Sequence, residues 1–212
     1  LANLNSYLTE QIAAANVAPS IDLDSSGAGT GWSNSFTEGG SAVMVVDSDV
    51  LVSDADSASL ASATVVLTNA KTGDQLSAAS LPSGITAVVN TGVAGQITVT
   101  LTGSASAADY QTALKAITFS NSSATPDTTT RSITVKVNDG SADSNLATTS
   151  ITVTSVNSAP ALSNLNGDSV TFTEGGSAVL LDASGNATLT DSDSTDFNGG
   201  TLTASIVTNR VS

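Results

Sequence analysis

Thr37-Glu38-Gly39-Gly40-Ser41-Ala42-Val43 returns unchanged as Thr173-Glu174-Gly175-Gly176-Ser177-Ala178-Val179, about 136 positions later. That distance is the length of one domain rather than of a short solenoid turn. In each copy an Asp-x-Asp loop follows the Glu, after 16 residues at Asp54-Ala55-Asp56 and after 17 at Asp191-Ser192-Asp193. The chain therefore contains two copies of one repeat.

The residues between these landmarks favour short strands. Aromatic residues make up 3% of the chain, and β-branched and small polar residues dominate. Turn-rich segments such as Asn69 to Asp74 and Asn138-Asp139-Gly140 separate the apolar runs. Several short punctuated strands predict an all-β, two-sheet sandwich. The predicted strands are Ala42 to Val46, Ala63 to Leu67, Ile97 to Leu101, Ile133 to Val137 and Ile151 to Thr154.

Two helices interrupt the strand pattern. Leu4, Leu8 and Ile12 recur every four residues, which predicts a short N-terminal helix over residues 1–16. Ser106 followed three residues later by Asp109 is a capping-box pattern and predicts a second short helix at the edge of the core.

Pro-containing junctions divide the chain. Val17-Ala18-Pro19 and Val156-Asn157-Ser158-Ala159-Pro160 predict a complete repeat over residues 17–156 and a partial repeat over 157–212. Residues 201–209 match residues 61–69, and nothing corresponds to the first copy after about residue 75. A sandwich without those strands has open edges and half a core, so we expect another chain, or an absent part of this one, to complete it.

Composition limits the function. The formal net charge of −14 would repel nucleic acid and anionic membranes, and no apolar run reaches the roughly 20 residues of a membrane span. The chain has no Cys and no His, which removes disulfides, thiol nucleophiles, imidazole bases and the usual zinc ligands. Catalysis would rest on a carboxylate pair such as Asp54 and Asp56, without a clustered aromatic lining. The sequence therefore predicts a protein that is not an enzyme.

Clustered carboxylates suit a different chemistry. Acids at alternate positions of a loop place hard oxygen donors around one point, as Ca²⁺ requires. A divalent cation would also relieve the repulsion among uncompensated carboxylates and stiffen a secreted protein without disulfides. The alternative interpretation is that each Asp forms a turn and is solvated.

The order of these features resembles a cadherin-type repeat, and more closely the cadherin-like tandem repeats of giant bacterial surface adhesins. The resemblance rests on the Pro-bearing junction, Glu38, Asp54-Ala55-Asp56 and Val137-Asn138-Asp139-Gly140. The resemblance covers residues 17–156 fully and 157–212 in part. It implies an immunoglobulin-like sandwich with calcium at the junctions between repeats. The ligand positions that it implies are Glu38, Asp54, Asp56, Asp139 and Asn157 in the first copy, and Glu174, Asp191 and Asp193 in the second.

The sequence also departs from that family. Ser158 stands where an Asp is common, the junction Asn16-Val17-Ala18-Pro19 has no acid, and the mid-domain Asp-Arg-Glu element is missing. We therefore expect fewer or weaker ions per junction than in animal cadherins. Other acids that could compensate are Asp22, Asp24, Asp47, Asp49, Asp182 and Asp196.

Two functions follow from these expectations. The first is a rigid calcium-binding spacer in an extracellular adhesin at the bacterial cell surface, with neighbouring repeats of the same protein as partners. A glycan or protein ligand would then be bound by other parts of that protein. The alternative is a self-assembling filament or sheath subunit, a homopolymer joined by strand complementation between chains. Direct carbohydrate binding would depend on Trp32 alone, for which packing at a sheet edge is the simpler role.

Overall fold

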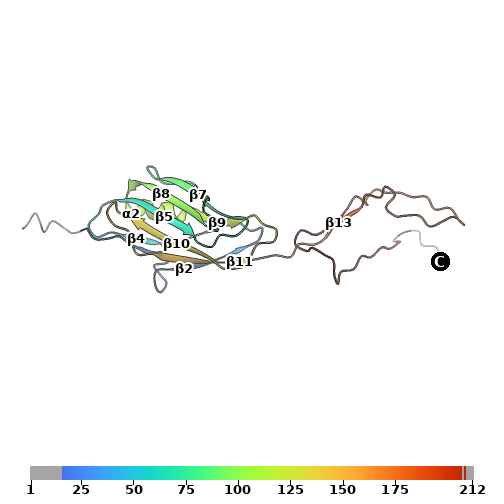
Figure 1. The fold of residues 1–212 in the computed structure, drawn as a ribbon, viewed down its shortest axis with the longest axis horizontal. Helices are drawn as coiled ribbons and strands as arrows, with labels where there is room; N and C mark the ends of the chain where they lie inside the picture. Colours follow the sequence, from blue (N-terminus) through green and yellow to red (C-terminus); the bar gives the residue numbers. More distant parts are fainter. Residues whose placement is uncertain (1–15, 207, 209–212) are drawn as a thin grey trace, which may run out of the picture. The chain divides into compact units, whose positions relative to one another are not determined.

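The computed structural model describes residues 16–206 and residue 208 of the chain. These residues are mostly β-sheet with one short helix (Figure 1). The chain divides into two units, Leu1–Val156 (unit 1) and Asn157–Ser212 (unit 2). The helix predicted over residues 1–16 lies outside the described residues except for Asn16.

Residues 16–156 of unit 1 contain three sheets. The largest has six strands in the order β2 (Trp32–Thr37), β11 (Ala147–Thr154), β10 (Arg131–Asn138), β5 (Leu60–Leu67), β8 (Ile97–Ala105) and β7 (Thr86–Asn90). A three-stranded sheet has the order β3 (Val43–Met44), β9 (Ile117–Asn121) and β6 (Asp74–Ala78). The third sheet pairs β1 (Ser20–Asp22) with β4 (Leu51–Ser53). Within unit 1, β2 runs parallel to β11, and the other strand pairs are antiparallel.

Period-two alternation places one face of each central strand in a single core. In β10, Ile133, Val135 and Val137 are fully buried, while the residues between them are half-buried. The two larger sheets face each other across this core, because Phe36 of β2 and Phe119 of β9 pack edge to face with ring centroids 5.6 Å apart. The alternation that predicted β5, β8, β10 and β11 therefore reports the side of each strand that is buried.

The predicted capping box begins helix α2 (Ala107–Lys115), and the structure confirms it. The Ser106 hydroxyl accepts the Asp109 N–H at 3.1 Å, and the Asp109 carboxylate accepts the Ser106 N–H at 3.3 Å. These bonds satisfy two amides at the helix start. The helix then buries Tyr110, Ala113 and Leu114 against the core.

Replacing Ser106 by Ala is expected to destabilise unit 1 by about 1 kcal/mol, because the Asp109 amide loses its acceptor. The free energy of unfolding in urea measures this effect. Ser104→Ala, at an exposed position just before the helix, is the matched control and should change stability by less than about 0.5 kcal/mol. Equal losses in the two variants would contradict the capping role.

The repeated heptapeptide forms the same turn in both units. Thr37 accepts the N–H of Gly40 at 2.9 Å, and Thr173 accepts the N–H of Gly176 at 2.9 Å. Gly39 and Gly175, the third residue of each turn, have φ values of 69° and 74°. Only glycine adopts this conformation without strain, which gives a physical reason for its presence at both positions.

Unit 2 repeats the first sheet pairing of unit 1. Its strands β12 (Ala161–Ser163) and β13 (Thr188–Thr190) are antiparallel, as β1 and β4 are. In each unit a Pro directly precedes the first strand and an Asp-x-Asp loop directly follows the second. The two copies therefore share local structure as well as sequence.

Candidate metal centre

The segment that enters each unit has the sequence Asn-x-Ala-Pro, at residues 16–19 in unit 1 and 157–160 in unit 2, and is called the entry segment below. In unit 1 it leads into β1, whose Ser20 pairs with Ser53 at the end of β4. The Asp-x-Asp loop starts at the next residue, Asp54. The pairing of β1 with β4 therefore brings this loop beside the entry segment. Asp56 Oδ2 accepts the backbone N–H of Val17 at 3.0 Å.

Asp139 joins this loop from a distant part of the chain. It follows β10 directly, and its carboxylate accepts the Asn16 side-chain amide at 2.8 Å. The N–H groups of Ser141 and Ala142 also donate to it, at 2.6 and 2.7 Å. Asp139 therefore holds the entry segment together with Asp56.

Hydrogen bonds lower the pKa values of Asp54 and Asp139. The N–H of Ser57, and then that of Asp56, lowers the pKa of Asp54, against burial and the negative charge of nearby Asp139. The N–H of Ala142, the Asn16 amide and the N–H of Ser141 lower the pKa of Asp139. Among the described residues, no ion pair involves Asp54, Asp56 or Asp139. In the part of the chain that the structure describes, this negative charge is therefore balanced only by hydrogen bonds.

Unit 2 reproduces the arrangement with its own residues. Asp193 Oδ2 accepts the N–H of Ser158, the position equivalent to Val17, at 2.5 Å. Asp191 Oδ1 accepts the N–H groups of Asp193 and Ser194, both at 3.2 Å, as Asp54 Oδ1 accepts those of Asp56 and Ser57. The Ser158 N–H, with the Asp191 side chain, lowers the pKa of Asp193. The clamp between the Asp-x-Asp loop and the entry segment is thus duplicated.

Glu38 lies elsewhere in unit 1. It follows β2, and its N–H donates to Thr154 at the end of β11 at 2.9 Å. Its Oε2 accepts the N–H of Val156, also at 2.9 Å. Asp139 lies beside the start of β11, so most of this eight-residue strand, about 23 Å, separates the two acids. The structure therefore does not bring Glu38 together with Asp54, Asp56 and Asp139.

The remaining two predicted ligands make few contacts. Asn157 opens the entry segment of unit 2, and its side-chain amide donates to the Ser158 carbonyl at 2.9 Å. Glu174 is exposed, and no hydrogen bond of its side chain is found among the described residues.

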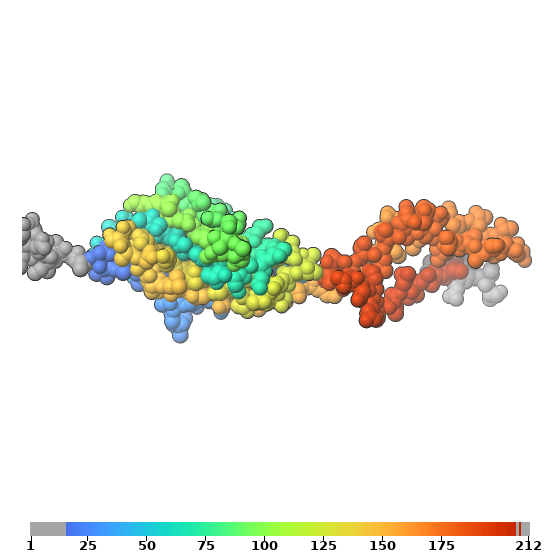
Figure 2. Space-filling view, in the orientation of Figure 1, coloured from blue at the N-terminus to red at the C-terminus, as the bar shows by residue number. Residues whose placement is uncertain are grey.

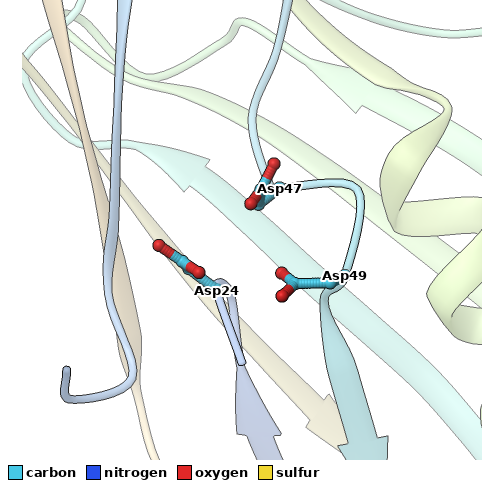
Figure 3. A group of neighbouring side chains, drawn as sticks. All are labelled: Asp24, Asp47 and Asp49. Carbon is cyan, nitrogen blue, oxygen red and sulfur yellow. The ribbon is translucent and has the colours of Figure 1, made fainter. Parts of the chain in front are cut away.

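A second acidic group lies within unit 1. Asp24, Asp47 and Asp49 each offer one carboxylate oxygen, and these three oxygens lie within 4.8 Å of one another (Figure 3). The Asp47 N–H donates to the Leu23 carbonyl at 2.9 Å, which places the loop after β3 beside the end of β1. Asp54, Asp56 and Asp139 do not converge to that distance. The visible sequence signal for this group is two Asp-x-Asp spacings, 22/24 and 47/49.

Three carboxylate oxygens in these groups have no partner among the residues that the structure describes. Asp54 Oδ2, Asp193 Oδ1 and Asp49 Oδ1 are inaccessible to solvent and accept no hydrogen bond. A buried acceptor without a donor is costly, and for an ionised carboxylate a cation removes that cost. Donor sets made only of carboxylate, amide and backbone oxygens fit a hard divalent ion such as Ca²⁺.

The lowered pKa values predict acid sensitivity of unit 1. Folding lowers the pKa values of Asp54 and Asp139 below the ordinary value of 3.8. Their contribution to the stability of unit 1 is therefore complete above about pH 4. It is lost as the pH falls through their folded values. Asp127 extends this loss of stability to lower pH, because hydrogen bonds from the Thr129 side chain and N–H, together with Lys71, lower its pKa to about 2.

Thermal melting between pH 6 and pH 2.5 measures this decline. Asp139→Asn should show a shallower loss of melting temperature below pH 4 than the parent chain. A parent melting temperature that is equal at pH 5 and pH 3 would contradict the assignment.

No helix among the described residues is long and apolar enough to cross a membrane. Comparisons of the chain with protein-family models, with curated proteins and with solved structures found no match.

Proposed function

We propose that the chain is a calcium-binding spacer segment of a large adhesin at the bacterial cell surface. Its repeats are immunoglobulin-like, cadherin-like β-sandwiches, and the ion stiffens each repeat where the entry segment joins it. Neighbouring repeats of the same protein are its partners. The proposal assigns no catalytic step to the chain.

The duplicated clamp is the observation that carries the proposal. A loop whose only task was to turn the chain would not need an acid that holds the entering backbone, yet each unit has one, Asp56 in unit 1 and Asp193 in unit 2. Each loop also contains one buried carboxylate oxygen, in Asp54 and in Asp193, that no described residue supplies with a donor. A cation that binds such a loop restrains the entry segment, since Asp56 and Asp193 also hold that segment's amide.

Calcium is expected to raise the melting temperature of the full chain, and EGTA is expected to reverse the change. At a free calcium concentration 100-fold above Kd, the linkage effect is about 2.7 kcal/mol. Chelation should also increase the radius of gyration, measured by small-angle scattering, because the entry segments lose their restraint. Equal melting temperatures and radii with and without calcium would defeat the proposal.

Matched variants identify the ligands. The pair Asp54→Asn and Asp56→Asn should remove one calcium from the stoichiometry measured by titration calorimetry. Asp127→Asn, whose residue lies before β10 rather than after it, removes one charge and should leave the stoichiometry unchanged. Asp47→Asn reports on the group with Asp24 and Asp49. If only Asp47→Asn reduced the stoichiometry, the ion would belong to that group and the clamp would be structural.

A further inference from the structure

The first strand pair of each unit has the same register. Ile21 of β1 faces Val52 of β4, and Leu162 of β12 faces Leu189 of β13. Each pair lies two residues after a Pro and two residues before an Asp-x-Asp loop. Position-by-position comparison of the units is therefore justified by backbone pairing as well as by sequence.

Equivalent apolar side chains are buried in unit 1 and exposed in unit 2. Phe36 and Phe172, which precede the two copies of the heptapeptide, are 1% and 62% exposed. The same contrast holds for Ile21 and Leu162 (2% and 48%), for Val52 and Leu189 (3% and 40%), and for the residues directly before Asp47 and Asp182, Val46 and Leu181 (0% and 66%). Unit 2 therefore carries the core residues of a repeat without a core.

The exposed side chains line open hollows. One, of about 670 Å³, is bordered by Leu162, Leu181, Leu202 and Ile206. A second, of about 430 Å³, is bordered by Leu162, Leu189 and Phe197. Figure 2 shows unit 2, in orange and red, as narrow lengths of chain with open space between them. An apolar surface of this kind marks an interaction site.

Unit 1 shows what covers this face. Its β2, which holds Phe36, pairs with β11, and β3 pairs with β9. Residues 168–173 and 179–180, the equivalents of β2 and β3, form no strand in unit 2. Strand formation needs a partner ladder, so these segments lack the counterparts of β9 and β11. The counterpart of β10, with its buried Ile133, Val135 and Val137, is absent from the described part of unit 2 as well.

A second copy of this chain cannot supply the counterparts of β9, β10 and β11 from its unit 1. The apolar faces of its own β9, β10 and β11 are already buried in its unit 1. Their release would unfold that unit. This argues against complementation between two identical chains.

We propose that the apolar face of residues 162–206 is a docking surface for a strand-bearing segment equivalent to residues 70–154, which completes unit 2 as a second repeat. The occupant supplies a strand parallel to residues 168–173, as β11 does for β2, and a strand antiparallel to residues 179–180, as β9 does for β3. The inference concerns apolar burial and does not rest on the proposed calcium function.

A chimeric chain tests the proposal. Val207-Thr208-Asn209 matches Leu67-Thr68-Asn69, so residues 70–156 can be joined directly after Asn209. Hydrogen exchange at Leu162 and Leu189, followed by mass spectrometry, should slow by at least about 100-fold relative to the parent chain, since cooperative burial protects amides. Fluorescence of the dye ANS, which reports exposed apolar surface, should fall. Both measurements are made with calcium and with EGTA.

The matched control carries Asp at the grafted copies of Ile133, Val135, Ile151 and Val153. It should exchange as fast as the parent chain. Fast exchange in the unmodified chimera would overturn the proposal. So would slow exchange at Leu162 in a parent chain that sedimentation shows to be dimeric, because the occupant would then be a second copy. Success in EGTA would support the docking surface even if calcium proved to have no effect.

Discussion

Asp74→Ala is expected to destabilise unit 1 by about 3–5 kcal/mol, because it removes the buried partner of Arg131 and leaves only the part-exposed Asp127, 3.9 Å away. Both side chains are 0% exposed, and Arg131 Nε donates to Asp74 Oδ2 at 2.6 Å. Asp74 also accepts the Asn121 side-chain amide at 2.8 Å and the Lys71 N–H at 2.8 Å. The substitution therefore removes one acceptor from several donors at once.

Urea unfolding of unit 1 measures this loss. Replacing both Asp74 and Arg131 by Leu should cost less than Asp74→Ala alone, since no buried charge then remains. Lys136→Ala breaks the ion pair with Asp143, whose side chains are 39% and 46% exposed, and should cost no more than about 1 kcal/mol. Equal effects of Asp74→Ala and Lys136→Ala would contradict the importance of burial.

Phe36→Ala is expected to cost about 3–5 kcal/mol, because the ring is 1% exposed and its removal leaves a cavity beside Phe119. Phe172→Ala, the same change at the equivalent position, should alter the free energy of unfolding by less than about 0.5 kcal/mol. The midpoint of the cooperative urea transition measures both.

The completed chimera gives this comparison its control. With residues 70–156 joined after Asn209, Phe172→Ala should become as destabilising for unit 2 as Phe36→Ala is for unit 1. A large effect of Phe172→Ala in the parent chain would show that unit 2 already has a core of its own.

Much of the local structure could be predicted from the sequence. Alternation at Ile133, Val135 and Val137 correctly predicted β10 and its buried face, and the Ser106 and Asp109 pair correctly predicted the start of α2. The run Ala42 to Val46 was predicted as one strand, but only Val43 and Met44 pair with β9. Val45 and Val46, which end the run, are both fully buried rather than alternating.

For the candidate metal ligands, the sequence revealed the motifs but not which of them lie together. The Asp-x-Asp loops and the junctions were visible as motifs, because their residues are neighbours in the chain. Their grouping was not visible, because it depends on strand direction. Antiparallel pairing of β1 with β4 brings Asp56 to Val17, while parallel pairing of β2 with β11 carries Glu38 to the far end of the sheet.

The sequence alone determined the repeat, the capping box at Ser106, the alternating strands and the absence of thiol and imidazole chemistry, since each depends on residue type and near neighbours. Only the tertiary structure decided that Asp139 joins Asp54, that Asp24, Asp47 and Asp49 converge, and that Arg131 is buried. Those contacts join residues far apart in the chain. Backbone pairing between distant strands sets them, and no local pattern encodes that pairing.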